Sequence, residues 1–299
     1  MKKTFFMAVA VLMTVSCSNE CVNEVLDKEQ ATVPVTVRVS EFSVTQEVMP
    51  SSGGTTRAAQ NVADYNDVKA IDLAFYDGET LVYKHTQLRS DPTTYTTFGE
   101  FSSNLPIGSY KMVAIGRGYY DEDVFVLTSP TAAGYTSERV RETFCAEQDV
   151  VVTSSTPLEL EVTLNRIVAK LNIVSTDNLS DKVAVMRTTY SKGSKSFSPT
   201  SGLATDDNGI SITNSPYKTS NDKLSIISFV FLASDEETMD ITIEALDANN
   251  NVLFTKVVQN VTLQRNAKTT LTGAIFTASS TASSFKLETE WIIGDTVNF

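Results

Sequence analysis

The most distinctive reactive residue of this chain is a cysteine near its start. Met1-Lys2-Lys3 is a short basic opening, and a mostly apolar run follows from Thr4 to Val15. Small residues end this run immediately before Cys17, so cleavage there would make the cysteine the new N-terminus. This is the layout of a bacterial lipoprotein signal, in which Cys17 is acylated. We expect residues 1–16 to be a signal peptide and the lipid to hold the precursor at the cell outer membrane.

Two alternative interpretations of this first segment have less support. One is an ordinary secretory signal in which the cysteine stands by chance. The second is a transmembrane helix, but the apolar run is too short to span a bilayer. Residues 17–31 are polar and acidic without sustained periodicity, which predicts a flexible tether.

The second residue suited to covalent processing is Arg57. It stands before Ala58, at the end of a Gly-, Ser- and Thr-rich stretch that predicts a loop. A basic residue in an exposed loop is where a trypsin-like protease cuts, and an ordinary loop arginine is the alternative. A cut here would disconnect residues 33–44 from the rest of the fold.

Catalytic and metal-binding chemistry has little support. His85 is the one histidine of the sequence, and no Gly-x-Ser-x-Gly turn accompanies it. Residues 206–209 and 247–251 are rich in calcium-type oxygen ligands, but neither segment has the full loop with its closing glutamate. A carbohydrate-active enzyme would need two carboxylates facing each other across a cleft, which the sequence cannot place. We expect neither enzymatic activity nor a cofactor.

Composition limits the partners further. The formal net charge is −12 at pH 7 over 299 residues. An acidic surface repels nucleic acid and anionic lipid headgroups, so neither is an expected ligand. Cys21 and Cys145 are expected to be free thiols, although a disulfide between them in an oxidising compartment is the alternative.

Alternating apolar and polar residues begin directly after the tether, and they predict a half-buried strand. The phase of this alternation flips at Ser40-Glu41, which predicts a β-bulge or a bend. The apolar residues of the strand are Val33, Val35, Val37, Val39, Phe42 and Val44.

Similar patterns recur along the chain and predict about thirteen short strands separated by turns. The one stretch that allows a short helix is residues 137–145. Many short strands with almost no helical periodicity are typical of antiparallel sandwiches. We predict an all-β protein of two tandem β-sandwich domains, residues 32–164 and 165–299, with one large barrel as the alternative.

Short sequence motifs give the chain a resemblance to a known family. These are the lipoprotein signal, Thr56-Arg57-Ala58, Leu105-Pro-Ile-Gly-Ser-Tyr110, Pro157-Leu-Glu-Leu160, Arg166-Ile-Val-Ala-Lys-Leu171, and Arg265-Asn266 through the late Trp291 strand. Together they resemble the Bacteroidales fimbrillins, the pilins of type V fimbriae.

The resemblance implies transthyretin-like sandwich domains, lipidation on Cys17, arginine-specific proteolysis between Arg57 and Ala58, and assembly by donor-strand exchange. Residues 33–44 would be the strand that leaves. Residues 269–276 and 285–299 would be candidate donor strands, the latter with Phe285, Leu287, Trp291 and Ile293 as its apolar side chains. The implied partners are other fimbrial subunits and a host or bacterial surface ligand, first at the outer membrane and then in a cell-surface fimbrium.

The resemblance leaves several roles open. The chain is short for a shaft subunit, which favours a tip or minor subunit. Anchor subunits stay lipidated and uncut, and the Arg57 loop argues against that role. From a different class, the alternative is a monomeric surface lipoprotein that binds a glycan or a host protein.

Overall fold

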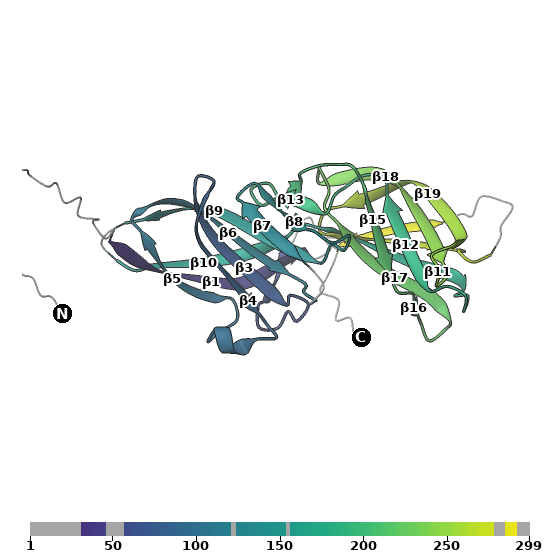
Figure 1. Cartoon of the computed structure of the whole chain (residues 1–299), viewed down its shortest axis with the longest axis horizontal. Coiled ribbons are helices and arrows are strands. Elements are labelled where there is room, and N and C mark those ends of the chain that lie inside the picture. Colours follow the sequence, from purple (N-terminus) through teal and green to yellow (C-terminus); the bar gives the residue numbers. More distant parts are fainter. Residues whose placement is uncertain (1–30, 46–56, 121–123, 154–155, 278–284, 292–299) are drawn as a thin grey trace, which may run out of the picture. The chain divides into compact units, whose positions relative to one another are not determined.

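Strands make up nearly all the regular structure of the computed structural model (Figure 1), which describes residues 31–45, 57–120, 124–153, 156–277 and 285–291. The helical element within these ranges is a single 3-10 turn, η1 (Pro92–Thr94). The predicted all-β class is therefore confirmed. No helix in the described ranges is long and apolar enough to cross a membrane.

Eight strands form the first sheet, in the order β2-β1-β10-β9-β6-β3-β4, with β5 paired to β1 off this path. Their bounds are β1 (Thr32–Thr45), β2 (Arg57–Asn61), β3 (Ala70–Asp77), β4 (Thr80–Leu88), β5 (Glu100–Pro106), β6 (Gly108–Arg117), β9 (Thr143–Val152) and β10 (Leu158–Arg166). The described pairing joins β9 to β10 at only two positions, Cys145–Asn165 and Phe144–Arg166. Side chains from both parts of the sheet enclose one apolar core, so the sheet folds over on itself.

β1 lies inside this sheet rather than at its edge (Figure 1). It pairs in parallel with β10 on one side. On the other side it pairs antiparallel with β5 and then with β2. The register against β10 shifts between Val39 and Glu41, which confirms the predicted bulge. Ser40 is the extra residue, since it has no partner in the register with β10. Because of it, Val39 and Phe42 both face the core.

Two further sheets contain most of the strands of the C-terminal half. One has the order β16-β17-β11-β20-β21 and the other β15-β12-β18-β19. Their bounds are β11 (Ala169–Asn178), β12 (Val185–Tyr190), β15 (Ile210–Asn214), β16 (Tyr217–Lys218), β17 (Lys223–Val230), β18 (Glu236–Leu246), β19 (Val252–Gln264), β20 (Ala267–Gly273) and β21 (Lys286–Trp291).

The two halves of the chain share a pairing scheme. β11 pairs in parallel with β20 and antiparallel with β17, as β1 does with β10 and β5. In each half, the first strand along the chain therefore pairs in parallel with a strand near the end of that half. β21 adds to this scheme, because it extends the sheet antiparallel to β20.

A small fourth sheet contains strands from both halves of the sequence. Its order is β14-β13-β8-β7, with β7 (Phe125–Ser129), β8 (Ala132–Tyr135), β13 (Ser196–Ser198) and β14 (Leu203–Ala204). Buried side chains form two clusters: one extends from Val33 to Leu164, and the other joins residues 167–276 to the outer face of the first sheet. The division of the chain near Asn165 into two transthyretin-like domains stays a prediction.

The short helix predicted for residues 137–145 is wrong. Residues 137–142 have no regular structure, and β9 begins at Thr143. Phe144 and Cys145 point to the two different cores on either face of this strand. The pairing of β9 with β6 outweighs the weak local preference for a helix.

Candidate functional site

The apolar side chains of β1 form a buried row, as predicted. The exposed fractions are 7% for Val33, 1% for Val35, 1% for Val37, 2% for Val39 and 0% for Phe42. Burial of each such side chain contributes about 1.5–3 kcal/mol. The side chain of Val44, the last predicted member, lies outside the described residues.

The backbone of β1 is engaged on both sides. Val35 to Ser43 pair with β10, while Thr32 to Arg38 pair with β5 and Glu41 to Thr45 with β2. A chain without β1 would therefore expose unpaired N–H and C=O groups along two facing edges. Such edges are templates for another extended strand.

The predicted cleavage site does not lie in a loop. Arg57 and Ala58 are the first residues of β2, and they register with Thr45 and Val44 of β1. β2 is the end strand of its sheet, which leaves its other edge without a neighbouring strand in the described structure. The side chains of Arg57 and Ala58, and residues 46–56 before them, lie outside the described residues.

A buried ion pair lies at the end of β1, and sequence reasoning missed it. The Arg166 Nε lies 2.8 Å from Oε1 of Glu142, and the Arg166 side chain has no exposed surface. Tyr65 donates its hydroxyl proton to Glu142 at 3.0 Å and accepts a hydrogen bond from Arg166 Nη2 at 2.9 Å. Burial, and then the charge of Glu142, raise the pKa of Tyr65, so the phenol stays protonated.

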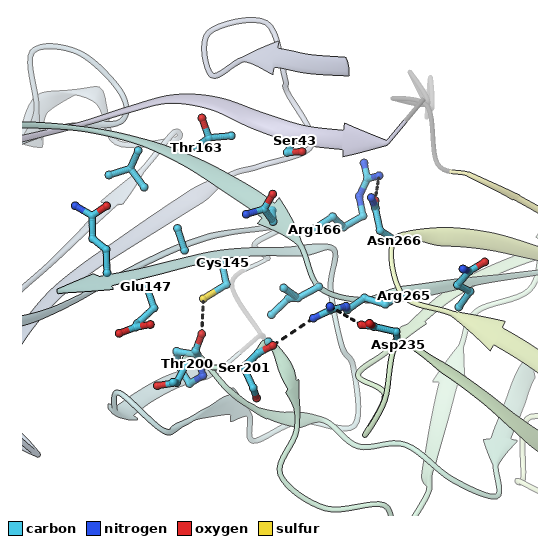
Figure 2. Close-up of a pocket in the computed structure, with 18 of the residues that line it drawn as sticks. Ser43, Cys145, Glu147, Thr163, Arg166, Thr200, Ser201, Asp235, Arg265 and Asn266 are labelled. Carbon is cyan, nitrogen blue, oxygen red and sulfur yellow. Dashed lines mark hydrogen bonds and ion pairs between the residues drawn. The ribbon is translucent and has the colours of Figure 1, made fainter. Parts of the chain in front are cut away.

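This ion pair connects β1 to the turn that precedes β20. The Phe42 ring centroid lies 4.9 Å from that of Phe144, and the Arg166 guanidinium carbon lies 4.9 Å from the Phe144 centroid. Arg166 Nη1 also donates to the side-chain oxygen of Asn266 at 3.0 Å (Figure 2). Asn266 adopts a positive φ of 60°, and its amide donates to Val168.

A polar cleft of about 1120 Å³ opens beside this ion pair, and its lining includes Arg166, Glu147, Glu161, Asp235 and Arg265 (Figure 2). Glu147 forms an ion pair with Lys111, and Asp235 forms one with Arg265. Two of the three acidic side chains of this lining therefore already have a basic partner.

The other residues considered for catalysis or metal binding take part in side-chain packing or in turns. His85 lies in β4 with its ring edge-on to Phe101, at a centroid distance of 5.9 Å. Asp206 accepts from the Ser194 hydroxyl and Asp207 from the Gly193 amide, so both stabilise a turn. Within the described ranges no three His, Cys, Asp or Glu side chains are grouped to hold a metal ion.

Cys145 is a buried free thiol, and its Sγ donates to the carbonyl of Pro199 at 3.6 Å. Burial raises the pKa of this thiol, which disfavours the reactive thiolate. Cys17, the predicted lipid site, and Cys21 lie outside the described residues.

The two candidate donor strands differ in the number of neighbouring strands and in the burial of their side chains. β20 lies between β11 and β21, and Thr269 and Leu271 are buried in it. β21 lies at the edge of the sheet, and Leu287 remains 45% exposed. Trp291 registers with Ala267, but its side chain and the whole of Ile293 lie outside the described residues.

Asp177 fixes the chain just before it leads to β21. Its carboxylate accepts hydrogen bonds from the backbone amides of Ile275, Phe276 and Thr277 at 2.7–2.9 Å. Partial burial tends to raise the pKa of Asp177, but these hydrogen bonds outweigh burial and lower it. Asp177 therefore holds the segment that follows β20 in place as far as Thr277.

The ion pair at the end of β1 gives a stability prediction. Replacement of Glu142 by Gln removes a negative charge that lies in direct contact with the buried Arg166 guanidinium, and we expect a loss of about 3–5 kcal/mol in the free energy of unfolding. The control is Glu244→Gln, which breaks the more exposed Arg187–Glu244 pair and should cost at most about 1 kcal/mol. Equal losses in urea denaturation would contradict the prediction.

Asp177 gives a prediction of pH dependence. A carboxyl group whose pKa is lowered by folding stabilises the folded state above its unfolded pKa, and this contribution disappears as the pH falls through the folded pKa. Asp177→Asn should therefore reduce stability at neutral pH, and the difference from the wild type should shrink below about pH 4. Thermal unfolding of both proteins, followed from neutral to acidic pH, measures this difference in stability. A difference that does not change with pH would show that the charge of Asp177 is unimportant.

Two solved bacterial structures share the fold of this chain. The chain aligns with the fimbrial anchor protein Mfa2 from Porphyromonas gingivalis at a TM-score of 0.51 and 8% identity, over 88% of this chain and 99% of that chain. It aligns with a candidate adhesin from Bacteroides ovatus at a TM-score of 0.51 and 13% identity, over 88% and 97% of the two chains. The resemblance to Bacteroidales fimbrillins is thus confirmed at the level of the fold.

Comparisons of sequence give a family but no functional description. No curated protein matches the chain. The profile of a family of unknown function, DUF6562, matches residues 30–291. That match includes every described residue, from β1 to the end of β21. The chain therefore belongs to DUF6562.

Proposed function

We propose that this protein is a structural subunit of a cell-surface fimbrium that supports adhesion and has no enzymatic activity. In this proposal it is exported as a lipoprotein through Cys17, cut after Arg57 and joined to other subunits by donor-strand exchange. The observation that carries the proposal is the position of β1. One cut after Arg57, the first residue of β2, breaks the covalent link between the fold and a strand that fills the interior of a sheet.

The edge position of β21 supports the second half of the proposal. A donor strand must leave its own sheet without unfolding it, and β21 pairs with β20 along one side only. Most of its described side chains face solvent. β20 is a poorer candidate because its removal would open the core next to β11.

One observation favours a second role, that of an uncut anchor subunit. The pairing of Arg57 with Thr45 holds the proposed cleavage site in a strand, and a protease requires a segment that can leave its partners. Mfa2, which shares the fold, is described as a fimbrial anchor protein. In this role β1 stays in place and the lipid on Cys17 is permanent.

Treatment of the purified precursor with an arginine-specific protease separates the two roles. For a fimbrial subunit we expect a product that begins at Ala58 and forms SDS-resistant oligomers. Arg57→Lys should remain uncut and monomeric. Arg38→Ala, which removes an arginine from β1 itself, should behave as the wild type. Wild-type protein that resists the protease, or a cut product that stays monomeric, would contradict assembly by strand exchange.

Metabolic labelling with a palmitate analogue tests the membrane anchor. We expect Cys17→Ser to lose the label and to leave the membrane fraction, because only the cysteine at the cleavage position receives lipid. Cys21→Ser is the matched control and should keep both properties. A label that depends on Cys21, or one that persists in Cys17→Ser, would contradict the predicted processing.

A further inference from the structure

The groove under β1 has two parts that differ in shape. The first part receives four valine side chains at alternate positions, from Val33 to Val39. The second part follows the bulge and receives a single aromatic ring, that of Phe42. Ordinary alternation would turn position 42 away from the core, so the bulge places Phe42 in a separate pocket.

Aromatic rings and the bare backbone of a glycine line this pocket. The Phe42 ring packs against Tyr65 at a centroid distance of 5.5 Å and against Phe144 at 4.9 Å. A Cβ atom on Gly116 would lie 2.8 Å from the Phe42 ring. The absence of a side chain at Gly116 therefore provides the space that a six-membered ring fills.

The far wall of the pocket is the buried ion pair. Phe42 contacts the two rings that contact this pair: Tyr65 binds both Glu142 and Arg166, and Phe144 lies under the guanidinium. A small side chain at position 42 would leave a cavity beside buried charges, and water in it would weaken their attraction. Arg166 transmits this change to Asn266 and the turn before β20.

We propose that the groove selects a donor strand that carries an aromatic side chain three positions after the last of four alternating small, β-branched side chains. This inference rests on the proposed function and names the partner that the groove fits. The strand must also run parallel to β10, as β1 does. The aromatic ring completes the shell around Arg166 and Glu142, so it connects a filled groove to an ordered turn at Asn266.

The C-terminal residues of this chain do not satisfy the requirement. Glu288 and Lys286 stand three and five positions before Trp291, where small apolar side chains are needed. Before Phe299 the same positions hold Thr296, which is β-branched but polar, and Gly294, which has no side chain. Residues 285–299 are therefore not the strand that this groove selects, and in this proposal β21 serves the groove of another subunit.

Synthetic peptides test the selection in the cut protein. The chain is cut after Arg57, or at a protease site inserted there if Arg57 resists, and refolded with a peptide of residues 32–45. We expect the Phe42→Ala peptide to bind about 100-fold more weakly and the Val37→Ala peptide about 10-fold more weakly. The peptide of residues 285–299 should bind no better than the Phe42→Ala peptide. Equal affinity of the two alanine peptides, or tight binding of residues 285–299, would overturn the inference.

Hydrogen exchange in the uncut chain tests the connection to the turn and does not depend on proteolysis. Phe42→Ala should accelerate exchange of the Asn266 amide, which donates to Val168, more than Val37→Ala does. Phe42→Leu is the milder variant if Phe42→Ala does not fold, and it should have an intermediate effect. Equal exchange at Asn266 in the Phe42 and Val37 variants would overturn the inference. Failure of the protease at Arg57 alone would count against the proposed function instead.

Discussion

The parallel pairing of β1 with β10 is the constraint on which the N-terminal half depends. β1 is the first of the described strands in the sequence, but it occupies the interior of the sheet. β10, β5 and β2 therefore all form backbone hydrogen bonds with a strand that precedes them in the chain. Its side chains also fill one wall of the core. The residues of β1 therefore supply both backbone hydrogen bonds and apolar side chains to this half of the fold. Loss of the strand would remove both contributions together.

The second half repeats the arrangement with a different outcome. β11 is held by β20 as β1 is held by β10, but β11 follows β10 after a short turn and both of its ends continue into the fold. A single cut could not remove it cleanly. Only the first half has its central strand, β1, at one end of the described strand order. The asymmetry of function proposed for the two halves thus follows from chain order.

Local periodicity predicted the parts of this structure that depend on neighbours in sequence. The valine alternation and the bulge before Phe42 were both readable because each depends on a few adjacent residues. β2 could not be predicted in this way, because its sequence, RAAQN, has no alternating pattern. It becomes a strand by pairing with β1. The ion pair was also out of reach, because Tyr65 and Arg166 lie 101 positions apart in the sequence. Arg166 stood out in the sequence only as the first residue of the motif Arg166-Ile-Val-Ala-Lys-Leu171, next to the predicted domain boundary.

The position of β1 ahead of Arg57 changes what stability means for this protein. In the uncut chain β1 is part of the same molecule as its groove, so its effective concentration is high and folding does not depend on dilution. Once the link is cut, the same contacts belong to a complex of two chains, and the folded fraction follows mass action. A cut subunit would then be most stable where other subunits are abundant. Local crowding at the growing end of a polymer would become a determinant of its fold.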